Sequence, residues 1–256
     1  MTRLTIDQFI CRQDNFSVIL HDPASGQTAS IDAPAGDRIA SRLSQGSANL
    51  THLLITHHHP DHVEGIPALT AAFDPKVIGP AAEAGKIAGL TESLNDGDTF
   101  EFAGRTVEVI STPGHTSGHI CFHIPDEQLL FAGDTLFALG CGRLFEGSPE
   151  DMFNSLNRLA ALPDETSVYC GHEYTRSNAA FAMAVDPDNA ELEARRAEIE
   201  NLLAKGLATL PTTIGIEKRT NPFLRASDPG IRKALGMENA TDLAVFTELR
   251  ARKDRF

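Results

Sequence analysis

The segment Thr56-His57-His58-His59-Pro60-Asp61-His62 constrains this chain more than any other feature of its sequence. It directly follows the apolar residues 50–55, which predict a strand covered on both faces. Imidazoles and a carboxylate in the turn after a strand can converge on one point above the strand end. Because neutral imidazole and carboxylate are preferred ligands of zinc and other first-row dications, we expect a metal site here. Taken alone, the segment also suits a histidine-rich surface loop.

Four further loops place metal ligands, or supports for them, after predicted strands. Pro113-Gly114-His115, Gly133-Asp134 and Gly171-His172 each follow a strand, and Asp32 follows another. Active sites of layered α/β folds lie in loops past the strand ends, so these side chains can share one site with the histidine-rich segment. The surface-loop alternative is weaker for that reason.

The predicted elements change in kind near residue 175. Before it, short strands alternate with turn signals and with helices over 64–73 and 149–161; after it, a capped amphipathic helix spans 189–206. Two more helices open at Asp228-Pro229 and Thr241. We expect an α/β domain over 1–174 and a mostly helical domain over 175–256. The predicted strands cover 4–10, 16–22, 28–33, 50–55, 76–80, a hairpin at 99–112, 119–125, 128–134 and 166–172.

Charge and composition exclude several classes of partner. The 256 residues carry a net charge of −13, and residues 1–174, with 9 basic and 23 acidic side chains, account for −14. An acidic domain disfavours nucleic acids and anionic membranes as partners. The four cysteines show no CxxC spacing, and neither a membrane span nor a signal-peptide core is evident. We therefore expect a cytoplasmic protein with reduced thiols, and a monomer.

The ligand pattern resembles that of the metallo-β-lactamase superfamily, whose signature is HxHxDH followed by a distant His, Asp and His. The resemblance implies an α/β fold, the four-layer αββα sandwich, holding two divalent metal ions between its sheets. Matching the motifs residue by residue implies that His57, His59 and His115 bind metal 1, that Asp61, His62 and His172 bind metal 2, and that Asp134 bridges the two.

Such a donor set suits catalysis. It leaves open positions on each ion, as a catalytic site requires. Two dications about 3.5–4 Å apart can share a hydroxide that attacks a carbonyl. Asp61 and Asp134 would then act in catalysis together with that hydroxide. Zinc is the expected metal, although iron and manganese accept the same ligands.

Segments 140–147, 170–175, 221–225 and 249–256 resemble the glyoxalase II family, the hydroxyacylglutathione hydrolases. The resemblance implies hydrolysis of the thioester of S-2-hydroxyacylglutathione, with S-D-lactoylglutathione as the expected substrate. The family commonly has Lys where Arg143 stands and Tyr where Phe145 stands, so one hydroxyl is missing here. The implied glutathione contacts are Arg143, Phe145, Tyr174, Arg250 and Lys253.

Three alternatives remain. A glutathione-dependent sulfur dioxygenase (persulfide dioxygenase) has a related pocket but typically lacks the helical tail. Lactamase or lactonase activity, or another hydrolase reaction of this fold, is disfavoured by the cationic residues matched to glutathione binding. A non-enzymatic metal-binding protein is disfavoured because all seven ligand positions are filled. His58 is expected to point away from the ligands as a solvated or supporting side chain. His119 is expected to support a ligand or to be structural, and Asp32 to orient a ligand histidine.

Overall fold

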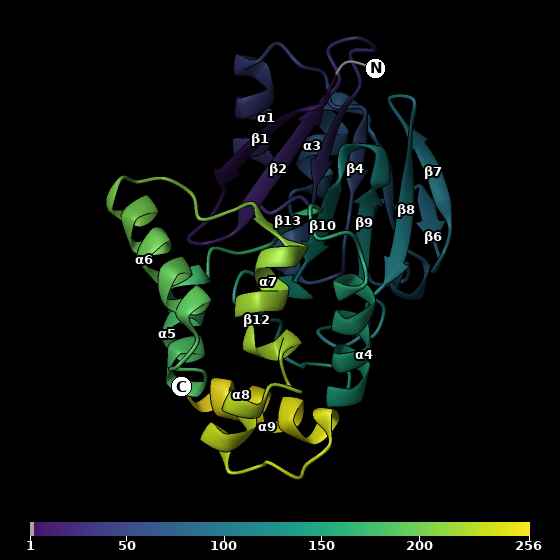
Figure 1. Cartoon of the computed structure of the whole chain (residues 1–256). Coiled ribbons are helices and arrows are strands. Elements are labelled where there is room, and N and C mark those ends of the chain that lie inside the picture. Colours follow the sequence, from purple (N-terminus) through teal and green to yellow (C-terminus); the bar gives the residue numbers. More distant parts are fainter. Residues whose placement is uncertain (1–2) are drawn as a thin grey trace. The chain divides into compact units, whose positions relative to one another are not determined.

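The computed structural model describes residues 3–256, which form two compact units (Figure 1). The first unit contains the described residues up to Ser111 together with Gly118–Gly133. The second contains Thr112–Ser117 and Asp134–Phe256. The predicted domain boundary between residues 174 and 175 divides the chain differently and stays a prediction. No helix within residues 3–256 has the length and apolar character needed to cross a membrane.

The first unit contains a six-stranded sheet whose strands follow one another in sequence order from β1 to β6. The strands from β1 to β3 pair antiparallel, and those from β3 to β6 pair parallel. Helices α1 (Gly36–Gln45) and α3 (Ile66–Phe73) supply Ile39 and Leu69 to a buried cluster that includes Leu53 of the sheet. The strands are β1 (Thr5–Ile10), β2 (Phe16–His21), β3 (Thr28–Ile31), β4 (His52–Leu54), β5 (Lys76–Pro80) and β6 (Glu92–Leu94).

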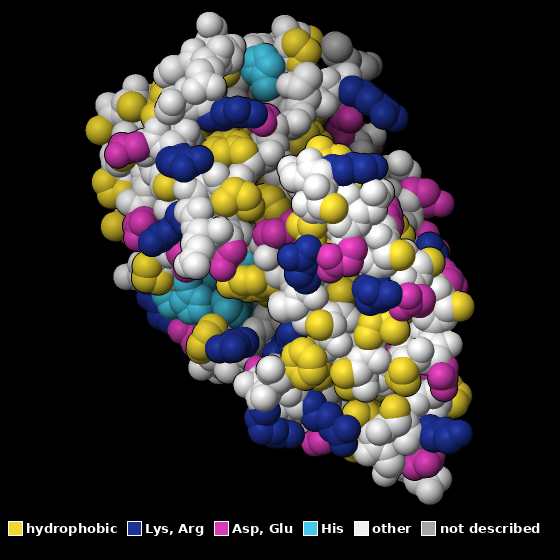
Figure 2. All heavy atoms as spheres, turned by 90° about the vertical axis from the view of Figure 1, so that its left-hand side faces the viewer, with side chains coloured by type: hydrophobic (Ala, Val, Ile, Leu, Met, Phe, Trp, Pro, Cys, Tyr) yellow, Lys and Arg dark blue, Asp and Glu magenta, His cyan; other side chains and the backbone are white. Residues whose placement is uncertain are grey.

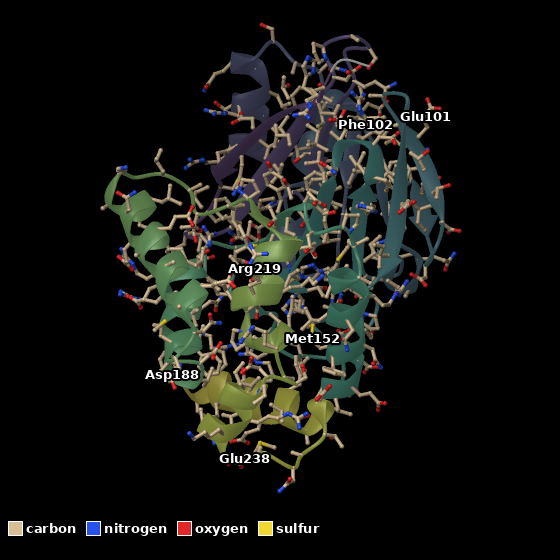
Figure 3. The ribbon with its side chains drawn as sticks, in the orientation of Figure 1. Glu101, Phe102, Met152, Asp188, Arg219 and Glu238 are labelled. Carbon is tan, nitrogen blue, oxygen red and sulfur yellow. The ribbon has the colours of Figure 1, made fainter. Side chains whose placement is uncertain are left out.

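Four further strands of this unit pair antiparallel and belong to a second, six-stranded sheet: β7 (Thr99–Phe102), β8 (Arg105–Ser111), β9 (Ile120–Ile124) and β10 (Leu129–Gly133). Strand β7 shows the alternation expected of a half-buried strand, because Glu101 is exposed while its neighbour Phe102 is fully buried (Figure 3). The turn between β7 and β8 has positive φ at Ala103 and Gly104, which confirms the predicted hairpin.

The second unit is mostly helical, and its predicted helix starts are confirmed. The side chains of Ser148, Asn189, Asp228 and Thr241 each accept a backbone N–H in the first turn of the helix that follows. Two short hairpin strands, β11 (Leu136–Phe137) and β12 (Gly140–Cys141), and the pair β13 (Ser167–Cys170) and β14 (Thr212–Thr213) complete it. The helices are α4 (Pro149–Ala160), α5 (Thr175–Val185), α6 (Ala190–Ala204), α7 (Ile214–Thr220), α8 (Pro229–Leu235) and α9 (Asp242–Arg255).

Candidate metal centre

Four predicted ligands of the first unit lie close together, two in the turn after β4 and two in helix α2 (Pro60–Val63). The ring of His57 lies 4.8 Å from that of His59 and 4.1 Å from that of His62. Nε2 of His62 is 3.8 Å from Oδ2 of Asp61. Figure 2 shows histidine side chains gathered in one patch of the surface. We call His57, His59, Asp61 and His62 the first cluster.

Asp32 fixes which ring nitrogen each buried histidine of this cluster presents to a metal. Oδ2 of Asp32 lies 2.8 Å from Nδ1 of His62, and both carboxylate oxygens accept the hydroxyl of Thr56. The Thr56 oxygen lies 3.0 Å from Nδ1 of His57. Since the Asp32 carboxylate only accepts, Nδ1 of His62 carries a proton. The Thr56 hydroxyl donates its proton to Asp32 and therefore accepts one from Nδ1 of His57. In both rings Nε2 then carries the lone pair that a metal needs. The predicted orienting role of Asp32 agrees with this geometry.

Asp61 is positioned from a distant part of the same unit. Nδ2 of Asn15, the residue directly before β2, donates to Oδ2 of Asp61 at 2.9 Å. The bond fixes the rotamer of a half-buried carboxylate that belongs to the ligand motif. Nothing in the sequence near Asp61 indicates Asn15, which lies 46 residues earlier.

The other three predicted ligands meet within the second unit, and we call His115, Asp134 and His172 the second cluster. Oδ2 of Asp134 is 3.3 Å from Nε2 of His115 and also 3.3 Å from Nε2 of His172. Nδ1 of His115 lies 2.9 Å from the carbonyl oxygen of Arg143, which can only accept. His115 therefore also presents Nε2. All three side chains are buried, so a carboxylate faces two imidazoles away from bulk water.

The backbone beside Asp134 leaves no space for a side chain at Gly142. A Cβ there would lie 2.0 Å from the carbonyl oxygen of Asp134, a distance at which atoms overlap. The N–H of Gly142 donates to the carbonyl oxygen of Thr135 at 3.1 Å. This close pairing of the two segments brings the Arg143 carbonyl to His115, so the Gly140–Arg143 motif contributes to the second cluster through its backbone.

The five predicted glutathione contacts all belong to the second unit. The side chain of Phe145 is 64% exposed, and Tyr174 stacks on the ring of His172 with centroids 4.8 Å apart. Arg250 is buried, with its guanidinium donating to the Cys141 carbonyl at 2.9 Å and to Asp254 at 2.9 Å. Nζ of Lys253 donates to the Ser177 carbonyl oxygen at 3.0 Å, and burial lowers its pKa to about 8. Arg143 is exposed.

A buried carboxylate that sequence reasoning missed holds the β11–β12 hairpin. Oε2 of Glu217 accepts two hydrogen bonds, one from the N–H of Leu139 at 2.7 Å and one from Nδ2 of Asn221 at 2.9 Å. Nδ2 of Asn221 also donates to the carbonyls of Phe137 and Gly140. Leu139 adopts φ +59°, a strained value for leucine, which these bonds and its full burial stabilise.

Glu83 is the second carboxylate that the sequence did not indicate. It is buried in the first unit, and its carboxylate lies 2.9 Å from Nδ1 of His58. His119 is fully buried, and its ring lies 4.9 Å from that of His57. Both findings concern positions beside the ligands rather than the ligands themselves.

Two family models divide the chain between them. Residues 12–172 match the model described as the metallo-beta-lactamase superfamily, and residues 173–256 match the hydroxyacylglutathione hydrolase C-terminus. A curated protein of Rhizobium meliloti (strain 1021), named hydroxyacylglutathione hydrolase, is 57% identical over 256 residues, which cover 100% of both chains. The chain belongs to the hydroxyacylglutathione hydrolase family. The resemblance to glyoxalase II is thereby confirmed.

A second curated relative and two solved structures are also similar to this chain. The hydroxyacylglutathione hydrolase of Brucella anthropi is 54% identical over 254 residues, covering 99% of this chain and 98% of that protein. The crystal structure of ETHE1 from Myxococcus xanthus is similar with a TM-score of 0.67 and 25% identity, covering 97% and 98% of the two chains. The BLEG-1 B3 metallo-beta-lactamase has a TM-score of 0.67 at 21% identity, covering 86% of this chain and 99% of its own.

These comparisons confirm the predicted fold class. This member of the hydroxyacylglutathione hydrolase family has the metallo-β-lactamase fold, with mixed sheets, helices and a C-terminal mostly helical part. Superfamily membership and its grouped His and Asp side chains indicate a divalent metal site. The donor set fits such an ion, because buried imidazoles presenting Nε2 beside carboxylates are the ligands that zinc and related dications accept.

Proposed function

We propose that this chain hydrolyses the thioester of S-2-hydroxyacylglutathione, with S-D-lactoylglutathione as the substrate, to a 2-hydroxy acid and glutathione. Its family membership makes it a thioester hydrolase. The observation that carries the choice of substrate is the match of residues 173–256 to the C-terminal region of that family. The cytoplasmic location and the monomeric state stay predictions.

We assign two divalent cations, most readily zinc, to the two clusters. His57, His59 and His115 would hold one ion, Asp61, His62 and His172 the other, and Asp134 both. When bound, the ions would supply a hydroxide nucleophile near neutral pH and polarise the thioester carbonyl. The contacts of Asp134 with two imidazoles inside the second cluster support its role as the shared ligand.

The protein's own part in this reaction is to hold its ligands in one protonation state and orientation. Asp32 and Thr56 keep the Nδ1 protons of His62 and His57, and the Arg143 carbonyl keeps that of His115. Fixing the tautomer also fixes the ring orientation and raises the basicity of Nε2. No Ser or Cys nucleophile is needed, and burial raises the pKa of the Cys141 and Cys170 thiols, which keeps both protonated.

Glutathione would be bound by residues of the second unit. Its two carboxylates call for fixed cations, and Arg143 and Lys253 supply them. Arg250 contributes differently, because its guanidinium is engaged with Cys141 and Asp254 and so supports the segment that leads to Arg143. Phe145 and Tyr174 offer aromatic faces next to His115 and His172, with ring centroids 5.3 and 4.8 Å from them.

A thioester assay with controlled metal content tests the proposal. Purified protein should hydrolyse S-D-lactoylglutathione, lose the activity on complete chelation and regain it when zinc is added back. Metal analysis of the same samples should give two ions per chain in the active state. Hydrolysis that persists after all metal is gone would refute the mechanism. Oxygen consumption with glutathione persulfide, in place of thioester cleavage, would instead favour the dioxygenase alternative.

A further inference from the structure

Two histidine-bearing segments of the first unit run side by side for only a short distance. The N–H of Ile120 donates to the carbonyl oxygen of Thr56 at 3.0 Å. The residue after Thr56 is His57 and the residue before Ile120 is His119, and their rings lie 4.9 Å apart, inclined by 31°. The ring of the first predicted ligand therefore lies against the second segment.

Beyond these two rings, each segment has one backbone N–H group that needs an acceptor. The N–H groups of His58 and Gly118 cannot bond to each other, and buried N–H groups need an acceptor. Glu83, the last residue of the short helix η1 (Ala81–Glu83), supplies one for each. Its Oε2 accepts the N–H of His58 at 2.7 Å, and its Oε1 accepts the N–H of Gly118 at 3.1 Å.

The local sequence is shaped to admit this carboxylate. A Cβ on Gly118 would lie 2.5 Å from Cγ of Glu83, so any larger residue at 118 would displace the glutamate. The Glu83 carboxylate is also 2.9 Å from Nδ1 of His58, and its side chain is fully buried. A charged side chain is seldom buried unless donors compensate it, and here two backbone N–H groups donate to the carboxylate.

We propose that Glu83 is a positioning residue of the metal centre. Its carboxylate joins the segment of His58 to that of Gly118 and thereby fixes His57 and His59, the ligands on either side of His58. This assignment rests on the proposed function for its meaning in catalysis, but it concerns metal binding first. Glu83 itself contacts neither metal nor substrate in this role.

Glutamine in place of Glu83 should remove one of the two hydrogen bonds that connect the segments, with almost no change in side-chain shape. An amide has one acceptor oxygen and one NH2 donor, so one of the two backbone N–H groups would face another donor. Changes in residues that orient metal ligands typically cost about 10- to 100-fold in metal affinity. We expect a loss of zinc affinity in that range for Glu83→Gln.

A zinc competition experiment on the whole protein tests this. Zinc-loaded wild type, Glu83→Gln and Glu127→Gln are titrated with a chromogenic chelator, and thermal unfolding of each metal-free protein is recorded alongside. Glu127 is the matched control, since it is a glutamate of the same unit paired with Arg105 in another region. Glu83→Gln should release zinc at a chelator concentration about 10- to 100-fold lower than the wild type requires. Glu127→Gln should retain zinc like the wild type even where its Tm falls.

Gly118→Ala provides a second, independent variant. Because it displaces Glu83 sterically, it should reproduce the zinc loss of Glu83→Gln, and it keeps the test decisive if one of the two fails to fold. At saturating zinc, kcat should fall in both while KM for the thioester changes by less than about twofold, because the proposed glutathione contacts lie in other segments.

The outcomes separate the two proposals. Zinc retention and kcat in both variants equal to those of Glu127→Gln would overturn the role of Glu83. Wild-type protein that binds zinc but leaves the thioester intact would overturn the proposed function, while a zinc loss specific to Glu83→Gln and Gly118→Ala would still support the positioning role.

Discussion

Replacing Lys253 with arginine should remove a pH dependence of substrate capture. Nζ of Lys253 is half-buried, lies 5.4 Å from the ring centroid of Phe181 and 5.5 Å from that of Phe256, and donates to the Ser177 carbonyl. Burial, followed by the charges of Arg250 and Arg143, lowers its pKa from 10.5 to about 8. The ammonium proposed to bind a glutathione carboxylate is thus lost within a pH range that is easily assayed.

The size of the effect follows from that pKa. A group with a pKa of about 8 is about 90% protonated at pH 7 and about 10% protonated at pH 9. Arginine stays charged throughout. The ratio of kcat/KM for the wild type to kcat/KM for Lys253→Arg should therefore fall by up to about tenfold from pH 7 to pH 9, since kcat/KM reports the free enzyme.

The ratio isolates Lys253 from the other titrations. The substrate amine and any metal-bound water titrate alike with both enzymes, and spontaneous thioester hydrolysis is subtracted from both. Initial rates are measured at low substrate across the pH range, with Lys253→Met as the variant that lacks the charge at every pH. A ratio that stays constant between pH 7 and pH 9 would show that the Lys253 charge plays no part in substrate capture.

Three further predictions concern metal, substrate and stability. Asp134→Ala should lose bound metal and activity together, as measured by mass spectrometry and the thioester assay; full metal content would contradict its role as the shared ligand. Phe145→Tyr adds a hydroxyl to an exposed ring and should lower KM about two- to tenfold, the value of one hydrogen bond; an unchanged KM would remove Phe145 from the glutathione site. Arg105→Met leaves the buried carboxylate of Asp22 and the partly buried carboxylate of Glu127 without their guanidinium partner, and should cost about 3–5 kcal/mol in urea unfolding. Arg105→Lys is its control, and a loss below about 1 kcal/mol would contradict the expectation.

The sequence predicts those elements whose signals are local. Helix α6 is recognisable because the Asn189 side chain accepts the N–H groups of Glu191 and Leu192, chemistry that is visible in consecutive residues. Helix α1 has no such signal, because the methyl side chain of its N-cap residue Ala35 cannot accept a hydrogen bond from the backbone. The two-residue strands β11 and β12 could not be foreseen either, since the hairpin depends on Glu217, 78 residues from Leu139.

The same distinction holds for the candidate site. The ligands are foreseeable, because histidines and aspartates at fixed spacing after strands have a chemical meaning of their own. Glu83 is not, because its partners are backbone N–H groups 25 and 35 residues away, and a backbone group leaves no mark in a sequence. The convergence of the seven ligands around two ions stays a prediction, and the structure adds the distances within each cluster.

The division of the chain into two units has a consequence for attempts to take the protein apart. The chain passes from one unit to the other after Ser111, Ser117 and Gly133, so the segment Thr112–Ser117 is separated in sequence from the rest of its unit. A gene fragment beginning at Asp134 would lack His115 and with it the hydrogen bond to the Arg143 carbonyl. Split-protein reporters or domain grafts built from this family member would therefore need that six-residue piece restored by an engineered linker, and a single cut cannot yield two intact halves.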